Sequence, residues 1–197
     1  MRQFILSALC LTVALYPTEL LKSQSYQAIS YQLSIQGTST LNSWTSTVKN
    51  VSVQGDFEFV DGALQKIRSG TVQIMTKSIE SDIHSSLMDE RTHQTLKADR
   101  HPSITYRVLS VKSVQKTGAE TFMIVYGTLT IGGVSKRTNL QFKTRVLSDG
   151  KLEITGSKKI IMSDYGITPP VFMLGALRVA DEVTITYEVQ LQKSPSM

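Results

Sequence analysis

The chain has 197 residues and a formal net charge of +5, with 41% hydrophobic and 7% aromatic residues. Its lysines and arginines are spread along the chain without forming a block, which argues against nucleic-acid binding. The single cysteine, Cys10, lies near the N-terminus, so a chain shortened at that end would hold no disulfide, thiol nucleophile or cysteine-ligated metal.

The first residues have the pattern of an export signal. Arg2 gives a positive start, Phe4–Tyr16 is an apolar run too short to span a bilayer easily, and Ser23-Gln24-Ser25 offers small residues for cleavage. An uncleaved anchor is the alternative, because the cleavage site is not a clean Ala-x-Ala. We therefore predict a signal peptide at residues 1–25, one mature domain at residues 26–197, and a periplasmic or secreted protein.

Apolar residues alternate with polar ones along most of the mature chain, which is typical of strands with one buried face. The pairs Asp61-Gly62, Thr117-Gly118 and Asp149-Gly150 separate the alternating runs as turns. In chain order the apolar positions are Tyr31, Leu33 and Ile35; Phe57 and Phe59; Val72 and Ile74; Ile104, Tyr106 and Val108; Leu152, Ile154, Ile160 and Met162; and Val179, Val183, Ile185, Tyr187, Val189 and Leu191. The pattern favours an all-β domain of about eight antiparallel strands closed into a barrel.

One segment, residues 85–102, departs from this alternation. It places Leu87, Met88 and Leu96 among other residues at helical spacing, and Pro102 stops the pattern and begins the next strand. We expect one short helix inserted between strands.

Residues 127–140 contain three glycines followed by a lysine and an arginine, as a phosphate-binding loop would. Such a loop requires G-x-x-x-x-G-K followed by Ser or Thr and then a helix, whereas Gly133 is followed by Val-Ser-Lys and an alternating run. Gly132-Gly133 therefore predicts a two-residue hairpin turn. The turn sets the register, in which Ile131 opposes Val134, Leu129 opposes Lys136, Gly127 opposes Thr138, Val125 opposes Leu140 and Met123 opposes Phe142.

Two features of this register bear on the barrel interior. Lys136 falls on the apolar face near the turn, so it either meets an anionic headgroup at the barrel mouth or lies in solvent at the hairpin tip. Gly127, Thr138 and Gly156 are small residues among large inward ones, which indicates free volume inside the barrel.

The segment Gly166–Leu177 is an apolar loop behind Pro169-Pro170. An apolar stretch of this length is buried, pairs with another subunit, or lines the entrance of a ligand.

Residue patterns for catalysis are missing from the sequence. His84, His93 and His101 fit no metal-binding spacing, and the chain contains no G-x-S-x-G elbow. We therefore predict a protein that is not an enzyme and that has no metal or other cofactor.

Several segments, taken in order, resemble the YceI family of polyisoprenoid-binding and other lipid-binding proteins. They are "GTSTLNSWTSTV" (37–48), "VQGDFEF" (53–59), "SLMDERTHQTLKADRHPSITYRV" (86–108), "GTLTIGGVSKRTNL" (127–140), "MSDYGITPP" (162–170) and "LRVADEVTITYEVQL" (177–191). The resemblance implies an elongated, lipocalin-like antiparallel β-barrel with a helical insertion. It also implies export to the periplasm, binding of a long isoprenoid or similar amphiphile in the barrel, and homodimers in some members.

The function expected from these observations is the binding of a long-chain amphiphile, for carriage or storage. The partners would be an isoprenoid or fatty-acid-like lipid and, transiently, a membrane surface. The residues predicted to line the channel or meet the headgroup are Tyr31, Trp44, Phe57, Ile74, Tyr106, Val125, Leu129, Lys136, Phe142, Met162, Tyr165, Ile185 and Tyr187.

Two other functions remain open at this level. The first is a structural or interaction module with a filled core that dimerises through the apolar loop. The second, less favoured, is an enzyme acting on lipid intermediates, which would need a base and a nucleophile inside the barrel.

Overall fold

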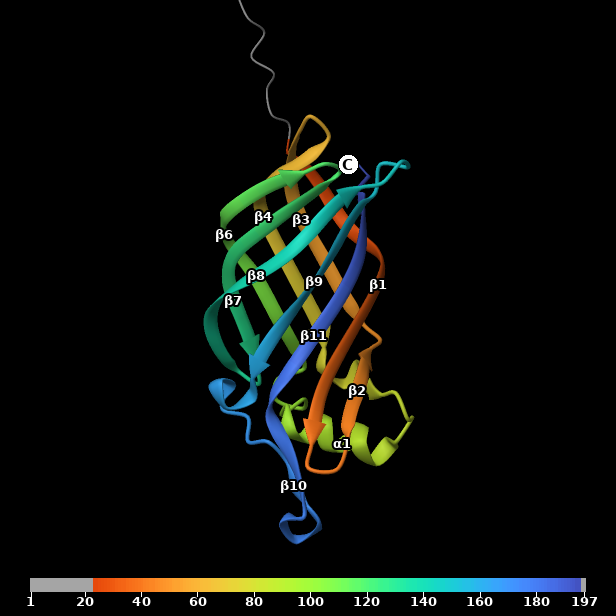
Figure 1. The fold of residues 1–197 in the computed structure, drawn as a ribbon, viewed down its shortest axis with the longest axis vertical. Helices are drawn as coiled ribbons and strands as arrows, with labels where there is room; N and C mark the ends of the chain where they lie inside the picture. The colour runs from red at the N-terminus through yellow and green to blue at the C-terminus, as the bar shows by residue number, and fades with distance from the viewer. Residues whose placement is uncertain (1–22, 196–197) are drawn as a thin grey trace, which may run out of the picture.

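The computed structural model describes residues 23–195, which form an elongated antiparallel β-barrel (Figure 1). Its strands are β1 (Gln24–Ser39), β2 (Ser43–Val48), β3 (Val51–Val60), β4 (Ala63–Met75), β5 (Ile79–Ser81), β6 (Ser103–Thr117), β7 (Glu120–Ile131), β8 (Val134–Val146), β9 (Leu152–Ile161), β10 (Val171–Phe172) and β11 (Leu177–Lys193). The helical segments are α1 (Ser86–Thr95) and the 3-10 turns η1 (Thr76–Ser78), η2 (Met162–Tyr165) and η3 (Met173–Gly175).

Eight strands close the barrel, as the alternation predicted. Neighbours follow the order β11, β9, β8, β7, β6, β4, β3 and β1, and β1 then pairs with β11 along nearly its whole length, from Tyr26 opposite Lys193 to Ser39 opposite Val179. Closure satisfies the backbone groups of the first and last strands, which an open sheet would leave as exposed edges.

The remaining short elements gather at one end of the barrel. There β2 replaces β3 as the neighbour of β1, β5 pairs with β2, and β10 pairs with the start of β11. In Figure 1 these elements and α1 lie at the lower end, and the C-terminal end of β11 lies at the upper end.

The hairpin of β7 and β8 confirms the predicted register. Ile131 pairs with Val134, and all the further predicted pairs follow in step as far as Met123 with Phe142. Both turn glycines have positive φ, 55° at Gly132 and 86° at Gly133, a conformation that glycine adopts without steric cost.

The predicted helix is also present, as α1. The Ser85 hydroxyl accepts a hydrogen bond from the Met88 amide at 3.4 Å, so Ser85 caps the first turn. The helix lies against β5 as an outer element, and none of its residues is buried; Leu87 is 61% exposed. Met162, by contrast, belongs to η2 and not to the strand run in which the alternation had placed it, because β9 ends at Ile161.

The strand glycines do not mark empty space, contrary to the expectation drawn from Gly127 and Gly156. A Cβ added to Gly127 would lie 2.5 Å from Cζ of Tyr106, and one added to Gly156 would lie 2.7 Å from Cζ of Tyr187. Each glycine therefore accommodates an aromatic ring from a neighbouring strand. The same holds for Gly37, where a Cβ would lie 2.6 Å from Cε2 of Trp44.

The interior is divided into two apolar clusters. The larger fills much of the barrel, and its upper part is closely packed around Met123, Val125 and Leu191, each with 0% exposure. The smaller cluster, near the lower end, consists of Leu33, Val48, Val51, Ile74 and Ile79.

The contact between Gly37 and Trp44 can be tested by a double-mutant cycle. Gly37→Ala alone should lower the free energy of unfolding by about 1–3 kcal/mol, because the new methyl group overlaps the indole ring. In a Trp44→Leu background the same change should cost much less, since the overlapping ring is gone. Urea unfolding of the four proteins measures the coupling, and additive effects would contradict the packing described here.

Candidate functional site

The candidate site is the interior region between the two apolar clusters. Eight partly buried apolar side chains pack against both clusters at once: Tyr31, Ile35, Val53, Val72, Leu96, Ile104, Ile185 and Tyr187. They come from β1, β3, β4, β6 and β11 and from the segment after α1. We call them the dividing residues.

The dividing residues keep part of their surface accessible although they lie inside the barrel. On β1 and β11, Ile35 lies opposite Ile185 and Leu33 lies opposite Tyr187, all on the inward face. An inward side chain of a closed barrel keeps accessible surface only where its neighbours do not fill the interior. Ile35, Ile104 and Ile185 keep such surface, whereas Val125 and Leu191 further up the barrel have none. The surface that stays accessible at this level of the barrel is therefore apolar.

A pocket of about 580 Å³ lies in the barrel wall beside this region, and two of the dividing residues, Tyr31 and Tyr187, line it. Strand β1 pairs with β3 through Gln24–Gln27 and with β2 through Ser34–Thr38, so the residues between these two stretches pair with neither strand. The pocket lies at this interruption, and its volume falls within the range of small-molecule sites.

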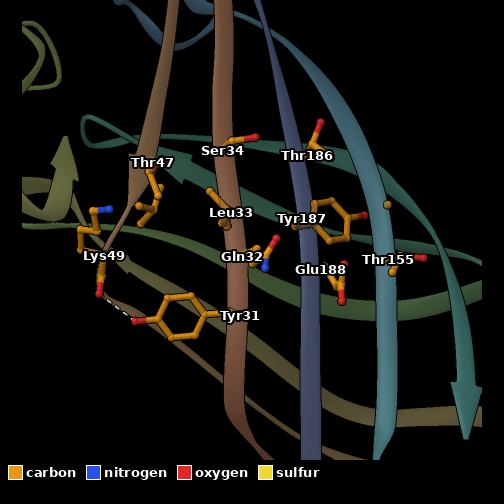
Figure 2. Close-up of a pocket in the computed structure, with 12 residues that line it drawn as sticks. Tyr31, Gln32, Leu33, Ser34, Thr47, Lys49, Thr155, Thr186, Tyr187 and Glu188 are labelled. Atoms are coloured by element: carbon orange, nitrogen blue, oxygen red, sulfur yellow. Dashed lines mark hydrogen bonds between the residues drawn. The ribbon is translucent and has the colours of Figure 1, made fainter. Parts of the chain in front are cut away.

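The lining of this pocket combines both faces of the wall (Figure 2). Leu33 and Tyr187 have inward positions, whereas Gln32 and Glu188 lie on the outer face. The Tyr31 ring reaches from β1 toward the turn between β2 and β3, where its hydroxyl donates a hydrogen bond to the Lys49 carbonyl oxygen at 2.8 Å. This bond spans the interruption and would have to break for the opening to widen.

Two tyrosines from the interior are held in the neutral form. Burial raises the pKa of Tyr106 to about 12. Burial, and to a smaller extent the nearby Tyr106, also raises the pKa of Tyr187. The Tyr187 hydroxyl donates to the Gln141 carbonyl oxygen at 2.9 Å, and the Tyr106 hydroxyl donates to the Thr138 carbonyl oxygen at 3.4 Å. Both rings therefore act as apolar walls with a hydrogen-bonding tip.

The structure distributes the residues predicted from sequence among several environments. Tyr31, Ile185 and Tyr187 are dividing residues, and Ile74 belongs to the smaller cluster. Those packed into or against the larger cluster are Trp44, Phe57, Tyr106, Val125, Leu129, Phe142, Met162 and Tyr165. Phe57 and Val125 lie in the closely packed upper part, with exposures of 3% and 0%.

Lys136 and Tyr165 come together at the end of the barrel where the hairpin turn lies. The Lys136 ammonium group bonds to Asp164 at 2.9 Å and lies 5.9 Å from the centre of the Tyr165 ring. The lysine side chain is 44% exposed, which agrees with the interpretation of a solvated residue at a hairpin tip. Tyr165 is 4% exposed and packs beneath it.

Sequence reasoning missed Ile35, Val53, Val72, Leu96 and Ile104 as dividing residues. Most of them stand on the inward side of runs that alternate, so the signal for their face was present. Alternation gives the face of a strand but not the height along the barrel. Height decides which inward residues border free space.

One polar group in this region has no partner. The indole nitrogen of Trp44 is buried and has no hydrogen-bond acceptor within reach among the described residues. A buried donor left unpaired costs free energy, which an oxygen atom of a bound molecule would recover. Trp44 is also the single tryptophan of the chain, so its fluorescence reports on this position alone.

Residues 23–195 contain no group of three or more His, Cys, Asp and Glu side chains arranged to hold a metal ion. None of the helices in this part of the chain reaches the length and hydropathy that a membrane crossing requires.

Comparison with known proteins identifies the family. Residues 31–191 match the family described as YceI-like domain. Among solved structures, BcnA of Burkholderia cenocepacia is 18% identical, with 82% of this chain and 96% of that chain covered and a TM-score of 0.62. A polyisoprenoid binding domain of Saccharophagus degradans is 12% identical, with 88% and 100% covered and a TM-score of 0.64.

A third solved structure, the YceI protein of Campylobacter jejuni, is 18% identical over the full length of both chains, with a TM-score of 0.50. At these identities the likeness shows a shared fold. The comparison with curated proteins gives no match.

The raised pKa of Tyr106 predicts loss of stability at alkaline pH. In the unfolded chain the phenol ionises near the ordinary tyrosine pKa of 10.0, whereas in the folded protein its pKa is about 12. The stabilising contribution is therefore complete below about pH 10 and is lost as the pH rises toward about 12. Chemical unfolding at a series of pH values across this range measures the free energy of unfolding. This free energy should decline less with rising pH in Tyr106→Phe than in the parent protein. An equal decline in both would show that Tyr106 is not the source.

Proposed function

The chain belongs to the YceI-like domain family, and from this premise we propose that it is an exported protein that holds the apolar chain of a long amphiphile in its barrel, for carriage or storage. The observation that carries this proposal is the set of apolar dividing residues, which lie inside a closed barrel and are only partly buried. Export is supported by the signal-like residues 1–25, most of which lie outside the described residues.

The energetics of such binding follow from burial alone. Each methylene group transferred from water into an apolar interior contributes about 0.8 kcal/mol. A chain of about ten buried carbons would therefore supply most of the affinity without polar contacts. A polyisoprenoid is one such ligand, and the structurally similar Saccharophagus domain carries that description.

An apolar rim at the lower end of the barrel supports transient contact with a membrane. It consists of Leu41, Leu87, Val171 and Leu174, which are 62%, 61%, 57% and 110% exposed. Contacts link these segments, since the Thr40 hydroxyl bonds to the Ala176 carbonyl oxygen and Arg91 lies over the Phe172 ring. Of the three arrangements considered for the apolar loop, burial does not hold for Val171 and Leu174.

The rim also carries positive charge. Arg91 lies 5.1 Å from the Phe172 ring centre, and Arg178 donates to the Gly175 carbonyl oxygen at 3.1 Å. Exposed leucines next to arginines suit an anionic lipid surface, because the apolar groups enter the interface while the cations meet headgroups. A carrier with such a rim could collect its ligand directly from a bilayer.

Filling the interior should reduce ligand binding. Ile35→Phe places a larger side chain among the dividing residues; if it excludes two methylene groups of the ligand, affinity falls by about 1.6 kcal/mol, or about fifteenfold. Hexadecanol binding, followed through Trp44 fluorescence, measures the effect, and native mass spectrometry records any co-purified lipid. The matched control is Leu109→Phe, at an exposed leucine of β6.

Two results would contradict the interior site. One is equal hexadecanol affinity in the parent and in folded Ile35→Phe. The other is an absence of binding by the parent protein to hexadecanol and polyprenols, which would favour the module with a filled core.

Removing the rim's apolar groups should weaken membrane contact. The double variant Val171→Ser and Leu174→Asn should bind vesicles of phosphatidylcholine and phosphatidylglycerol about thirtyfold less well, since each of the two apolar side chains contributes about 1 kcal/mol when buried in the interface. Asparagine tolerates the positive φ of 52° at position 174.

Vesicle sedimentation measures this binding, and Leu109→Ser, on the barrel wall, is its control. A change in the native mass of the parent from dimer to monomer in the rim variant, with no vesicle binding by either, would assign the rim to self-association instead.

A further inference from the structure

A second interruption of the barrel wall lies between β8 and β9. These strands pair only where Phe142–Val146 lies opposite Leu152–Gly156. Below that point β8 continues to pair with β7, and β9 continues to pair with β11. Each of the two strands therefore stays paired with its other neighbour while the two separate from each other. The result is a gap in the wall that is bordered on both sides by paired strands.

One side chain of the interior, that of Tyr187, reaches this gap. Gln141 lies at the point of separation, and its carbonyl oxygen accepts a hydrogen bond from the Tyr187 hydroxyl, which thus takes the place of a ladder partner. Tyr187 is itself one of the dividing residues, and it also lines the pocket of about 580 Å³. One side chain therefore connects the apolar interior with the gap.

A pocket of about 620 Å³ lies over the gap, and all the charged residues that line it are positive. Its lining includes Lys112 of β6, Arg137 of β8 and Lys158 and Lys159 of β9, together with uncharged residues and no carboxylate. Lys159 pairs with Glu182 at 2.8 Å. Within residues 23–195, the other three cations form no ion pair with a carboxylate. We call these four residues the basic gap.

The position of Lys158 adds to the excess of positive charge at this pocket. On β9 it shares the inward register with Gly156 and Ile160, and it is half-buried. A lysine in that register places its charge at the junction of the interior and the pocket. Three cations that line one pocket without an ion pair repel one another, and a bound anion would relieve this repulsion.

We propose that the basic gap binds the anionic head, a phosphate or carboxylate, of the amphiphile whose chain occupies the barrel. This inference rests on the proposed function and restricts its ligand class to anionic amphiphiles. Arg137 offers a planar fork of donors that matches phosphate and carboxylate oxygens, and the lysines add mobile ammonium groups. The head reaches the gap beside Tyr187 while the chain extends among the dividing residues.

The test compares three probes on the purified full barrel without detergent. Hexadecyl phosphate and hexadecanol share one chain and differ in charge, and both are followed through Trp44 fluorescence. Inorganic diphosphate carries the charge without a chain, and it is followed through the backbone amide signals of Ser157–Lys159. We expect hexadecyl phosphate to bind about tenfold more tightly than hexadecanol at low salt. This advantage should shrink as salt screens the charges.

The variants locate the effect. The double change Arg137→Gln and Lys158→Gln should remove the advantage of hexadecyl phosphate and leave hexadecanol binding unchanged. Arg137→Gln alone, at an exposed position, should reduce the affinity advantage of hexadecyl phosphate over hexadecanol by at least half. This single variant replaces the double variant in the test if the double variant does not fold. The control is Lys66→Gln, an exposed lysine of β4 outside this pocket, which should bind like the parent protein.

The outcomes separate the two proposals. Equal affinities for hexadecyl phosphate and hexadecanol, with no diphosphate response, overturn the anion site and leave the lipid carrier standing. Binding of diphosphate that the double variant abolishes, without binding of either long-chain probe, supports an anion site for free phosphate and overturns both the lipid carrier and the headgroup assignment. An advantage of hexadecyl phosphate that persists in the double variant also overturns the assignment to the basic gap.

Discussion

Barrel closure between the first and last strands is the constraint on which the rest of the structure depends. The ladder of β1 and β11 joins residues near opposite ends of the chain, from Tyr26 with Lys193 to Ser39 with Val179. Once it forms, each of the eight barrel strands has a neighbour on both sides, and one face of each must point inward. Apolar residues at alternate positions are then removed from water together, and this burial is the main favourable contribution to folding.

Closure is not uniform, and the departures from a complete ladder coincide with the regions of functional interest. The wall is interrupted where β1 passes from β3 to β2, and again where β8 and β9 separate. At each place a tyrosine hydroxyl takes over part of the lost backbone hydrogen bonding, Tyr31 to Lys49 in one and Tyr187 to Gln141 in the other. A carbonyl group left out of a ladder needs another donor, and these two hydrogen bonds supply one at each interruption. A barrel that binds a long chain requires openings, and these two are compatible with a stable wall.

The interior shows how packing and space coexist. Strand glycines receive the rings of Trp44, Tyr106 and Tyr187, so aromatic groups lie close to the wall and leave the centre less crowded. The upper part of the barrel is closely packed around Met123 and Val125, and this packing stabilises the fold. The dividing residues, by contrast, stay partly accessible. Stability and ligand capacity thus belong to different levels of one barrel, and this division is the physical basis for proposing a carrier.

The sequence by itself determined the features that local chemistry controls. Period-two alternation identified the inward face of most strands, Gly132-Gly133 set the register of β7 and β8 residue by residue, and Ser85 and Pro102 delimited the helix region. The tertiary structure alone decided at which height an inward residue borders free space, and it filled the sites at Gly127 and Gly156 with tyrosine rings. It also brought Lys158 to the gap between β8 and β9. The physical reason is that height, ring placement and strand separation depend on the stagger of strands distant in sequence, which no short-range pattern encodes.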